Sequence, residues 1–149
     1  MAINDDYKNQ LLNSIPVIQS MNLEIVKVKS NSLTLMAPLN ENINYEGTAF
    51  GGSINTLCVL SSYLLIHHIL KSNQIKFSSL VIQDSSIQYI KPVDSDFIAK
   101  AQTSSPQIDR FIKTLHKKES ARISIEAFIT CGTSSEIKAQ FKSRFVTKL

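Results

Sequence analysis

The chain is poor in proline, glycine and cysteine, and each shortage limits what it can be. With four prolines and four glycines among 149 residues, the sequence has no Pro/Gly/Ser-rich linker, internal repeat or low-complexity tract. Its two cysteines, Cys58 and Cys131, lie in apolar stretches without the paired spacing of a zinc site or the density of a secreted disulfide scaffold. We therefore expect residues 1–149 to form one domain with reduced core thiols and no metal site.

The sequence also lacks the features of export, membrane insertion and nucleic-acid binding. Asp5 and Asp6 stand where a signal peptide carries basic residues. The longest apolar region, Ile54–Leu70, is interrupted by polar residues and falls short of a membrane span. The sixteen Lys and Arg residues give a net charge of +4, but they are scattered and form no basic run of the nucleic-acid-binding kind. We expect a cytoplasmic protein whose mild positive charge suits an acidic small ligand or an acidic carrier protein.

Hydrophobic periodicity and turn residues predict two strands, one long helix and then four strands. Strands that do not alternate with helices favour an antiparallel sheet and an α+β fold, with the long helix on the concave face. This helix is apolar almost all round, so a second copy of the sheet is expected to cover its outer side, in a homodimer or a dimer of dimers. The predicted helices are 6–14, 51–71 and 107–118, and the predicted strands are 23–29, 33–39, 79–91, 95–103, 121–131 and 136–147.

The loop ahead of the long helix carries a family resemblance. It reads Asn44-Tyr45-Glu46-Gly47-Thr48-Ala49-Phe50-Gly51-Gly52-Ser53. This resembles the signature of hotdog-fold thioesterases, in which an Asn or Asp, a Gly three residues on and a His-Gly-Gly lead into the central helix. Phe50 stands in place of the histidine. In this respect the loop is most similar to the thioesterase subfamily that also forms the C-terminal domain of YiiD-type acetyltransferase-like proteins. Residues 87–93, Ile-Gln-Tyr-Ile-Lys-Pro-Val, resemble the family's strand ending in Tyr-x-x-Pro. The resemblance spans nearly the whole chain and implies a hotdog fold, an antiparallel sheet wrapped around one long central helix.

Two neighbouring glycines at the helix start predict a site for a carbonyl oxygen. Gly51 and Gly52 allow close backbone approach, and the N–H groups at a helix N-terminus are unsatisfied donors reinforced by the helix dipole. Such donors polarise a thioester carbonyl and stabilise the oxyanion formed when water attacks, by roughly 3 kcal/mol per donor. The alternative is that the pair only lets the helix pack close to the sheet. With Gly47, three glycines within six residues exceed what packing requires, which favours the binding interpretation.

Asn44 is the candidate for holding the nucleophilic water. The resemblance places it where family members carry an Asn or Asp that orients water or the thioester, and a carboxamide can do so by hydrogen bonds. The alternative is a turn-forming asparagine.

The general base is less clear, because the acid that some of these thioesterases carry about two turns into the helix is replaced by neutral Val59. Glu41, Glu46 and Asp84 are the possible substitutes. Asp84 is the strongest of them, since a carboxylate in the middle of a sheet has to be solvated or paired. Strict alternation points Asp84 away from the helix, and only a bulge at Ser85-Ser86 would turn it inward.

Further side chains are candidates for binding the substrate. Phe50 is expected to line an acyl tunnel, while Ser53 and Asn55 on the helix would meet substrate or the partner subunit. Arg110 and Lys113 share one face of the 107–118 helix with Lys117, where they would receive the phosphates of coenzyme A or an acidic carrier protein. The alternative for that face is ordinary solvation.

The first functional hypothesis is hydrolysis of an acyl-CoA or acyl-carrier-protein thioester. A non-catalytic acyl-thioester binding module is the second, supported by the absence of the histidine and of the helical acid. A third, a dehydratase of 3-hydroxyacyl thioesters, needs an acid/base pair, and Phe50 argues against it. No cofactor is expected beyond coenzyme A or phosphopantetheine as part of the substrate.

Overall fold

The computed structural model describes residues 5–149, and its elements follow the predicted order. The last strand begins three residues later than predicted, at Ala139, and the predicted 95–103 strand is shorter at both ends. The helices are α1 (Asp5–Asn13), α2 (Gly51–Ser72) and α3 (Ser105–Lys118), with 3-10 helices η1 (Pro16–Met21) and η2 (Asn40–Asn42), and the strands are β1 (Glu24–Val28), β2 (Ser32–Ala37), β3 (Ser79–Tyr89), β4 (Phe97–Gln102), β5 (Ser120–Cys131) and β6 (Ala139–Lys148).

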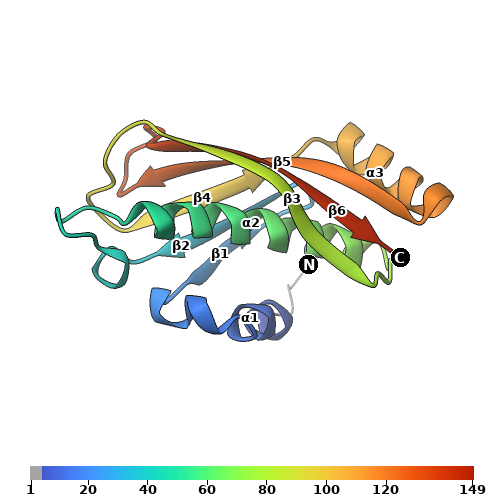
Figure 1. The fold of residues 1–149 in the computed structure, drawn as a ribbon, viewed down its shortest axis with the longest axis horizontal. Helices are drawn as coiled ribbons and strands as arrows, with labels where there is room; N and C mark the ends of the chain where they lie inside the picture. The colour runs from blue at the N-terminus through green and yellow to red at the C-terminus, as the bar shows by residue number, and fades with distance from the viewer. Residues whose placement is uncertain (1–4) are drawn as a thin grey trace.

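Within residues 5–149, the strands form a six-stranded antiparallel sheet in the order β1-β2-β4-β5-β6-β3, curved around α2 (Figure 1). The long helix packs against β2, β4, β5 and β6. β3 pairs with β6 along one side only, so in a single protomer its other side is a free edge. A long edge strand of this kind offers its unpaired backbone groups to another chain.

The sheet follows the alternation expected when one face packs on a helix and the other faces solvent. In β5, Ile123, Ile125 and Ile129 are buried, whereas Ser124 and Glu126, between them in the sequence, are exposed. In β5 the residues at odd positions therefore lie on the concave face, against the core. Three fully buried alanines on the concave face leave room for the helix to lie close to the sheet: Ala99, Ala101 and Ala127.

α2 is the core helix of the fold. It is long and apolar enough to cross a membrane by length and composition, but 67% of its apolar window is buried inside the protein. The hydroxyls of Ser61 and Ser62 are buried and both donate to the Cys58 carbonyl, at 3.0 and 2.8 Å. These bonds let polar side chains lie in the core without a desolvation penalty. The side of α2 turned away from the sheet is only half-buried, notably at Val59 and Tyr63.

Candidate active site

The segment between η2 and α2 forms a closed loop. Ile43 and Ala49 pair as an isolated antiparallel bridge, and the Phe50 N–H donates to the Asn42 carbonyl at 2.7 Å. Gly47 lies at the tip with φ of +84°, in the left-handed region that side chains rarely adopt. The glycine at position 47 is thus required by the turn itself.

Asn44 holds this loop together. Its Oδ1 accepts from the backbone N–H groups of Glu46 (2.8 Å) and Thr48 (3.0 Å), and its Nδ2 donates to Thr48 Oγ1 (2.8 Å) and the Ala49 carbonyl (3.3 Å). A carboxamide has two lone pairs and two N–H donors, so all four are engaged. The geometry therefore corresponds to the turn-forming alternative, and it leaves Asn44 no free group with which to hold water.

The start of α2 carries free backbone donors. The first amides of a helix have no acceptor within it, and here residues 51–53 follow Phe50, an N-cap residue whose side chain cannot accept a hydrogen bond. α3 provides a contrast, because Ser104 and Gln107 form a capping box at its start. The uncapped, positively polarised start of α2 is suited to a carbonyl oxygen or an anion.

Two aromatic rings flank the two glycines. A Cβ atom on Gly52 would clash with Cε1 of Phe50, so the Phe50 ring occupies the space that a side chain at position 52 would need. On the other side, the Tyr89 ring lies 3.6 Å from where a Gly51 Cβ would be, and its hydroxyl donates to the Gly51 carbonyl at 3.0 Å. Phe50 is 56% exposed, so its ring lies at the surface of the protomer.

This contact leads to a first prediction. We expect Gly52→Ala to displace the Phe50 ring without unfolding the protein, because the ring is exposed enough to swing away. In the Phe50→Ala background the same substitution should stabilise the protein by about 1 kcal/mol more, since alanine is the better helix former and nothing then opposes it. Free energies of unfolding for the two single variants and the double variant measure the coupling. Additive effects would show that the ring and the glycine are independent.

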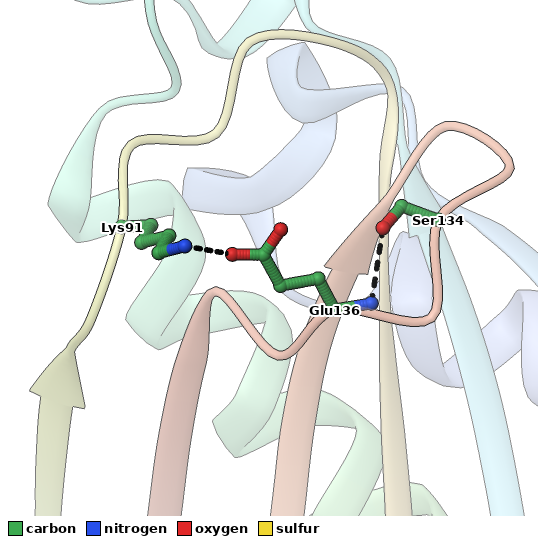
Figure 2. A network of polar contacts seen from close by, with 3 residues as sticks. All are labelled: Lys91, Ser134 and Glu136. Carbon is green, nitrogen blue, oxygen red and sulfur yellow. Dashed lines mark hydrogen bonds and ion pairs between the residues drawn. The ribbon is translucent and has the colours of Figure 1, made fainter.

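The segment after β3 is tied to the β5–β6 connection. Lys91 pairs with the Glu136 carboxylate, and the Glu136 N–H donates to Ser134 Oγ at 3.0 Å (Figure 2). The hydrogen bond from Lys91, followed by its charge, lowers the pKa of Glu136. The N–H groups of Ile90 and Lys91 both donate to the Lys138 carbonyl. An exposed ion pair adds little stability, so the role of this network is to fix where the strand ends.

Within one protomer, Asp84 does not lie at this site, contrary to the prediction from the sequence. The register irregularity of β3 lies between Ile82 and Asp84, not at Ser85-Ser86, and it leaves Asp84 exposed on the outer face beside Arg144, at 3.9 Å. Five residues separate Asp84 from Tyr89, which is about 16 Å along a strand. Asp84 therefore cannot act as the base at Gly51 and Gly52 of its own protomer.

Among the side chains of residues 9–149, the structure does not single out another base at the start of α2. Glu41 and Glu46 are exposed. Two turns into α2, beside Val59, the Cys58 thiol is fully buried, and burial raises its pKa to about 12, so it stays neutral. No group of three His, Cys, Asp or Glu side chains suited to a metal ion occurs among the described residues.

The remaining predicted residues fall into two groups. Ser53 is buried and Asn55 half-buried in the first turns of α2, so both lie close to the glycine pair. Arg110 and Lys113 are exposed on α3, and the start of α2 (teal) and α3 (orange) lie at opposite ends of the molecule (Figure 1). Within one protomer, these cations and the glycine amides do not form one site.

Two residues at the site were not predicted from the sequence. Tyr89 contacts Gly51, and its position in the Tyr-x-x-Pro motif was the available signal. Asn42 is buried, and its Nδ2 donates to the carbonyls of Met21 (2.9 Å) and Pro38 (2.8 Å), which anchors the beginning of the loop. No local pattern marks Asn42, because these two partners meet only after the chain has folded.

Comparison with known proteins identifies the family and supports the fold. The family model described as "Putative thioesterase (yiiD_Cterm)" matches residues 4–149. The chain is similar to the structure of a protein of unknown function from Chlorobaculum tepidum, with 26% identity over 97% of this chain and 95% of that one and a TM-score of 0.86. It is also similar to a putative thioesterase from Shewanella oneidensis, with 24% identity over 97% of this chain and 99% of that one and a TM-score of 0.80. A thioesterase from Haemophilus influenzae is similar with 14% identity over 99% of this chain and 92% of that one and a TM-score of 0.74. No curated protein matches the chain.

A six-stranded antiparallel sheet around a long central helix defines a hotdog fold, as in the solved structures from Shewanella oneidensis and Haemophilus influenzae. The chain belongs to the YiiD C-terminal-domain family of thioesterases, and the family supports thioesterase activity in general.

Proposed function

We propose that the chain hydrolyses acyl thioesters of coenzyme A or of an acyl carrier protein. The observation that carries this proposal is the uncapped start of α2, where no capping side chain accepts a hydrogen bond from the amides of Gly51 and Gly52. Here the positive end of a 22-residue helix meets the surface beside exposed aromatic rings. Such an end can receive a carbonyl oxygen while the apolar flank of the helix receives the acyl chain.

In this mechanism the backbone amides act on the transition state. The thioester oxygen accepts from them, water adds to the carbonyl carbon, and the negative charge that develops on the oxygen is stabilised by the fixed donors. As it adds, the water gives up one proton to solvent. The carbon–sulfur bond then breaks, the thiolate leaving group takes up a proton from solvent and the new carboxyl group releases its own, so the products are a carboxylate, a free thiol and one proton. Asn44 acts indirectly, because it sets the shape of the loop that leads into the helix.

The cations on α3 enter this mechanism through a second protomer. A twofold axis that pairs two free β3 edges makes them antiparallel, so the start of one β3 lies beside the end of the other. Ser79, at the start of β3, pairs with Lys148, which in turn pairs with Ser120 directly after α3. The α3 of a partner would therefore lie at the same end as the glycine pair. We propose a homodimer in which the partner's Arg110 and the partner's Lys113 receive the phosphates of the substrate.

A non-catalytic thioester-binding module is the second candidate. It is favoured by the exposed outer-face position of Asp84 and by Phe50 at the position where histidine is common. Both leave the glycine amides without an acid or base beside them in one protomer.

A panel of acyl thioesters separates the two functions. We expect purified protein to release free thiol from at least one short, long or aromatic acyl thioester on either carrier, as measured with a thiol reagent. The protein's own thiols should give little background, because Cys58 and Cys131 are both buried and should react only after denaturation. Binding of the same thioesters without any turnover would establish the binding module and refute hydrolysis.

A further inference from the structure

We propose that Tyr89 is a positioning residue, whose hydroxyl fixes the peptide unit that presents the Gly52 N–H to the substrate oxygen. This inference rests on the proposed function, because it assigns Tyr89 to the same site. The proposed mechanism assigns no role to this side chain. Tyr89 is the last residue of β3, and its hydroxyl contacts Gly51, the first residue of α2.

The geometry of one peptide unit carries the inference. Tyr89 Oη donates to the Gly51 carbonyl oxygen at 3.0 Å. That carbonyl and the Gly52 N–H are the two ends of the same planar unit, so a contact that fixes one end also fixes the direction of the other. A carbonyl that accepts an additional hydrogen bond also polarises its amide, and the N–H at the far end becomes a stronger donor. The hydroxyl can therefore both orient and strengthen the donor.

Gly51 needs an external contact of this kind. The two residues before it are held by backbone bonds, from Ala49 to the Val93 carbonyl at 2.8 Å and from Phe50 to the Asn42 carbonyl at 2.7 Å. At Gly51 a side chain, that of Tyr89, supplies the contact from outside the helix. Glycine has the largest backbone freedom of any residue, so a helix that begins Gly-Gly holds its first amides less firmly than other helices do.

Tyr89 is itself well placed to serve as an anchor. It pairs with Ala139 at the end of β3, and the Ile90 and Lys91 N–H groups both donate to the Lys138 carbonyl directly after it. Burial, followed by the neighbouring Cys58, raises the pKa of Tyr89 above its ordinary value of 10. The hydroxyl therefore keeps its proton at neutral pH and can donate it to the Gly51 carbonyl.

The test compares two tyrosine-to-phenylalanine variants. Tyr89→Phe removes the hydroxyl and keeps the ring, while Tyr45→Phe makes the same chemical change at a fully exposed side chain on the loop. With a thioester that the wild type hydrolyses, we expect Tyr89→Phe to lower kcat at least tenfold with KM changed less than twofold, and Tyr45→Phe to leave both unchanged. The amide resonance of Gly52 should shift, and its hydrogen exchange should become faster, in Tyr89→Phe alone.

The amide measurement needs no turnover, so it separates this inference from the proposed function. A wild type that hydrolyses no thioester while the Gly52 amide still responds to Tyr89→Phe would refute hydrolysis and keep the anchoring contact. An active Tyr89→Phe variant with unchanged kcat would overturn the inference. So would a loss of kcat with an unchanged Gly52 amide, because Tyr89 would then act on the substrate directly.

Discussion

Replacing Asn44 by alanine is expected to reduce thioester hydrolysis at least tenfold while the sheet and α2 stay folded. The substitution removes four hydrogen bonds that close the loop, and a hydrogen bond typically contributes about 1 kcal/mol to stability. Apart from Ala49, the loop lies outside the buried core, so the loss should appear as local opening with a modest fall in melting temperature. A tenfold loss of rate corresponds to about 1.4 kcal/mol in the activation barrier. Steady-state kinetics and hydrogen exchange of the Glu46 and Thr48 amides measure both effects.

A matched variant tells a structural role of Asn44 from a chemical one. Asn44→Asp keeps an oxygen that accepts from the Glu46 and Thr48 amides, but it loses both donations by Nδ2. It should therefore retain more activity than Asn44→Ala and more amide protection in the loop. If Asn44→Ala lost its activity while those amides stayed protected, the loop-closing role would be wrong and a direct role in holding water would regain support.

Replacing Ile82 by glutamate is expected to separate the proposed dimer and to abolish hydrolysis with it. Ile82 lies on the free edge strand, is 40% exposed, and pairs with Phe145, whose ring is 6.5 Å from that of Tyr63 on α2. In the dimer a partner would cover this apolar side, and a buried unpaired carboxylate there costs several kcal/mol. The dissociation constant should rise more than a hundredfold, as measured by sedimentation velocity over a range of concentrations.

The neighbouring residue supplies the control for this experiment. Val81 is 57% exposed and lies on the same strand, but its side chain is on the outer face of the sheet. Val81→Glu places the same charge one residue away, where it remains in solvent when two edges pair. We expect this variant to stay dimeric and active. Equal dissociation by both variants, or a wild type that is monomeric at assay concentrations, would refute edge pairing through the concave side of β3.

The fold was predictable because its signals are local. The alternation of buried isoleucines in β5, the long apolar helix and the glycine turn between β5 and β6 each follow from short-range periodicity or turn chemistry. Boundaries were less certain, since the last strand begins at Ala139 rather than Glu136. Residues before Ala139 are polar or exposed, and pairing with β3 and β5 alone determines where the ladder starts.

The candidate site was only partly predictable, because side-chain partners are set by the folded chain. The spacing of Asn44 and Gly47 marked the right loop, but it left two roles for Asn44 open until its four bonds were seen. Asp84 was assigned to the site on the condition of a bulge at Ser85-Ser86. The irregularity lies before Asp84 instead, and a one-residue change of register moves a side chain to the other face of a sheet.

By itself, the sequence determined the order of the elements, the apolar helix inside an antiparallel sheet and the glycine pair at its start. These depend on the chemistry of neighbouring residues, which the chain carries before it folds. Only the tertiary structure decided that Tyr89 contacts Gly51, that Phe50 covers Gly52 and that α3 lies at the far end of the protomer. The Tyr89 contact and the position of α3 depend on how the strands pair, and the Phe50 contact depends on the direction that its ring takes in the folded chain, so no spacing along the sequence encodes them.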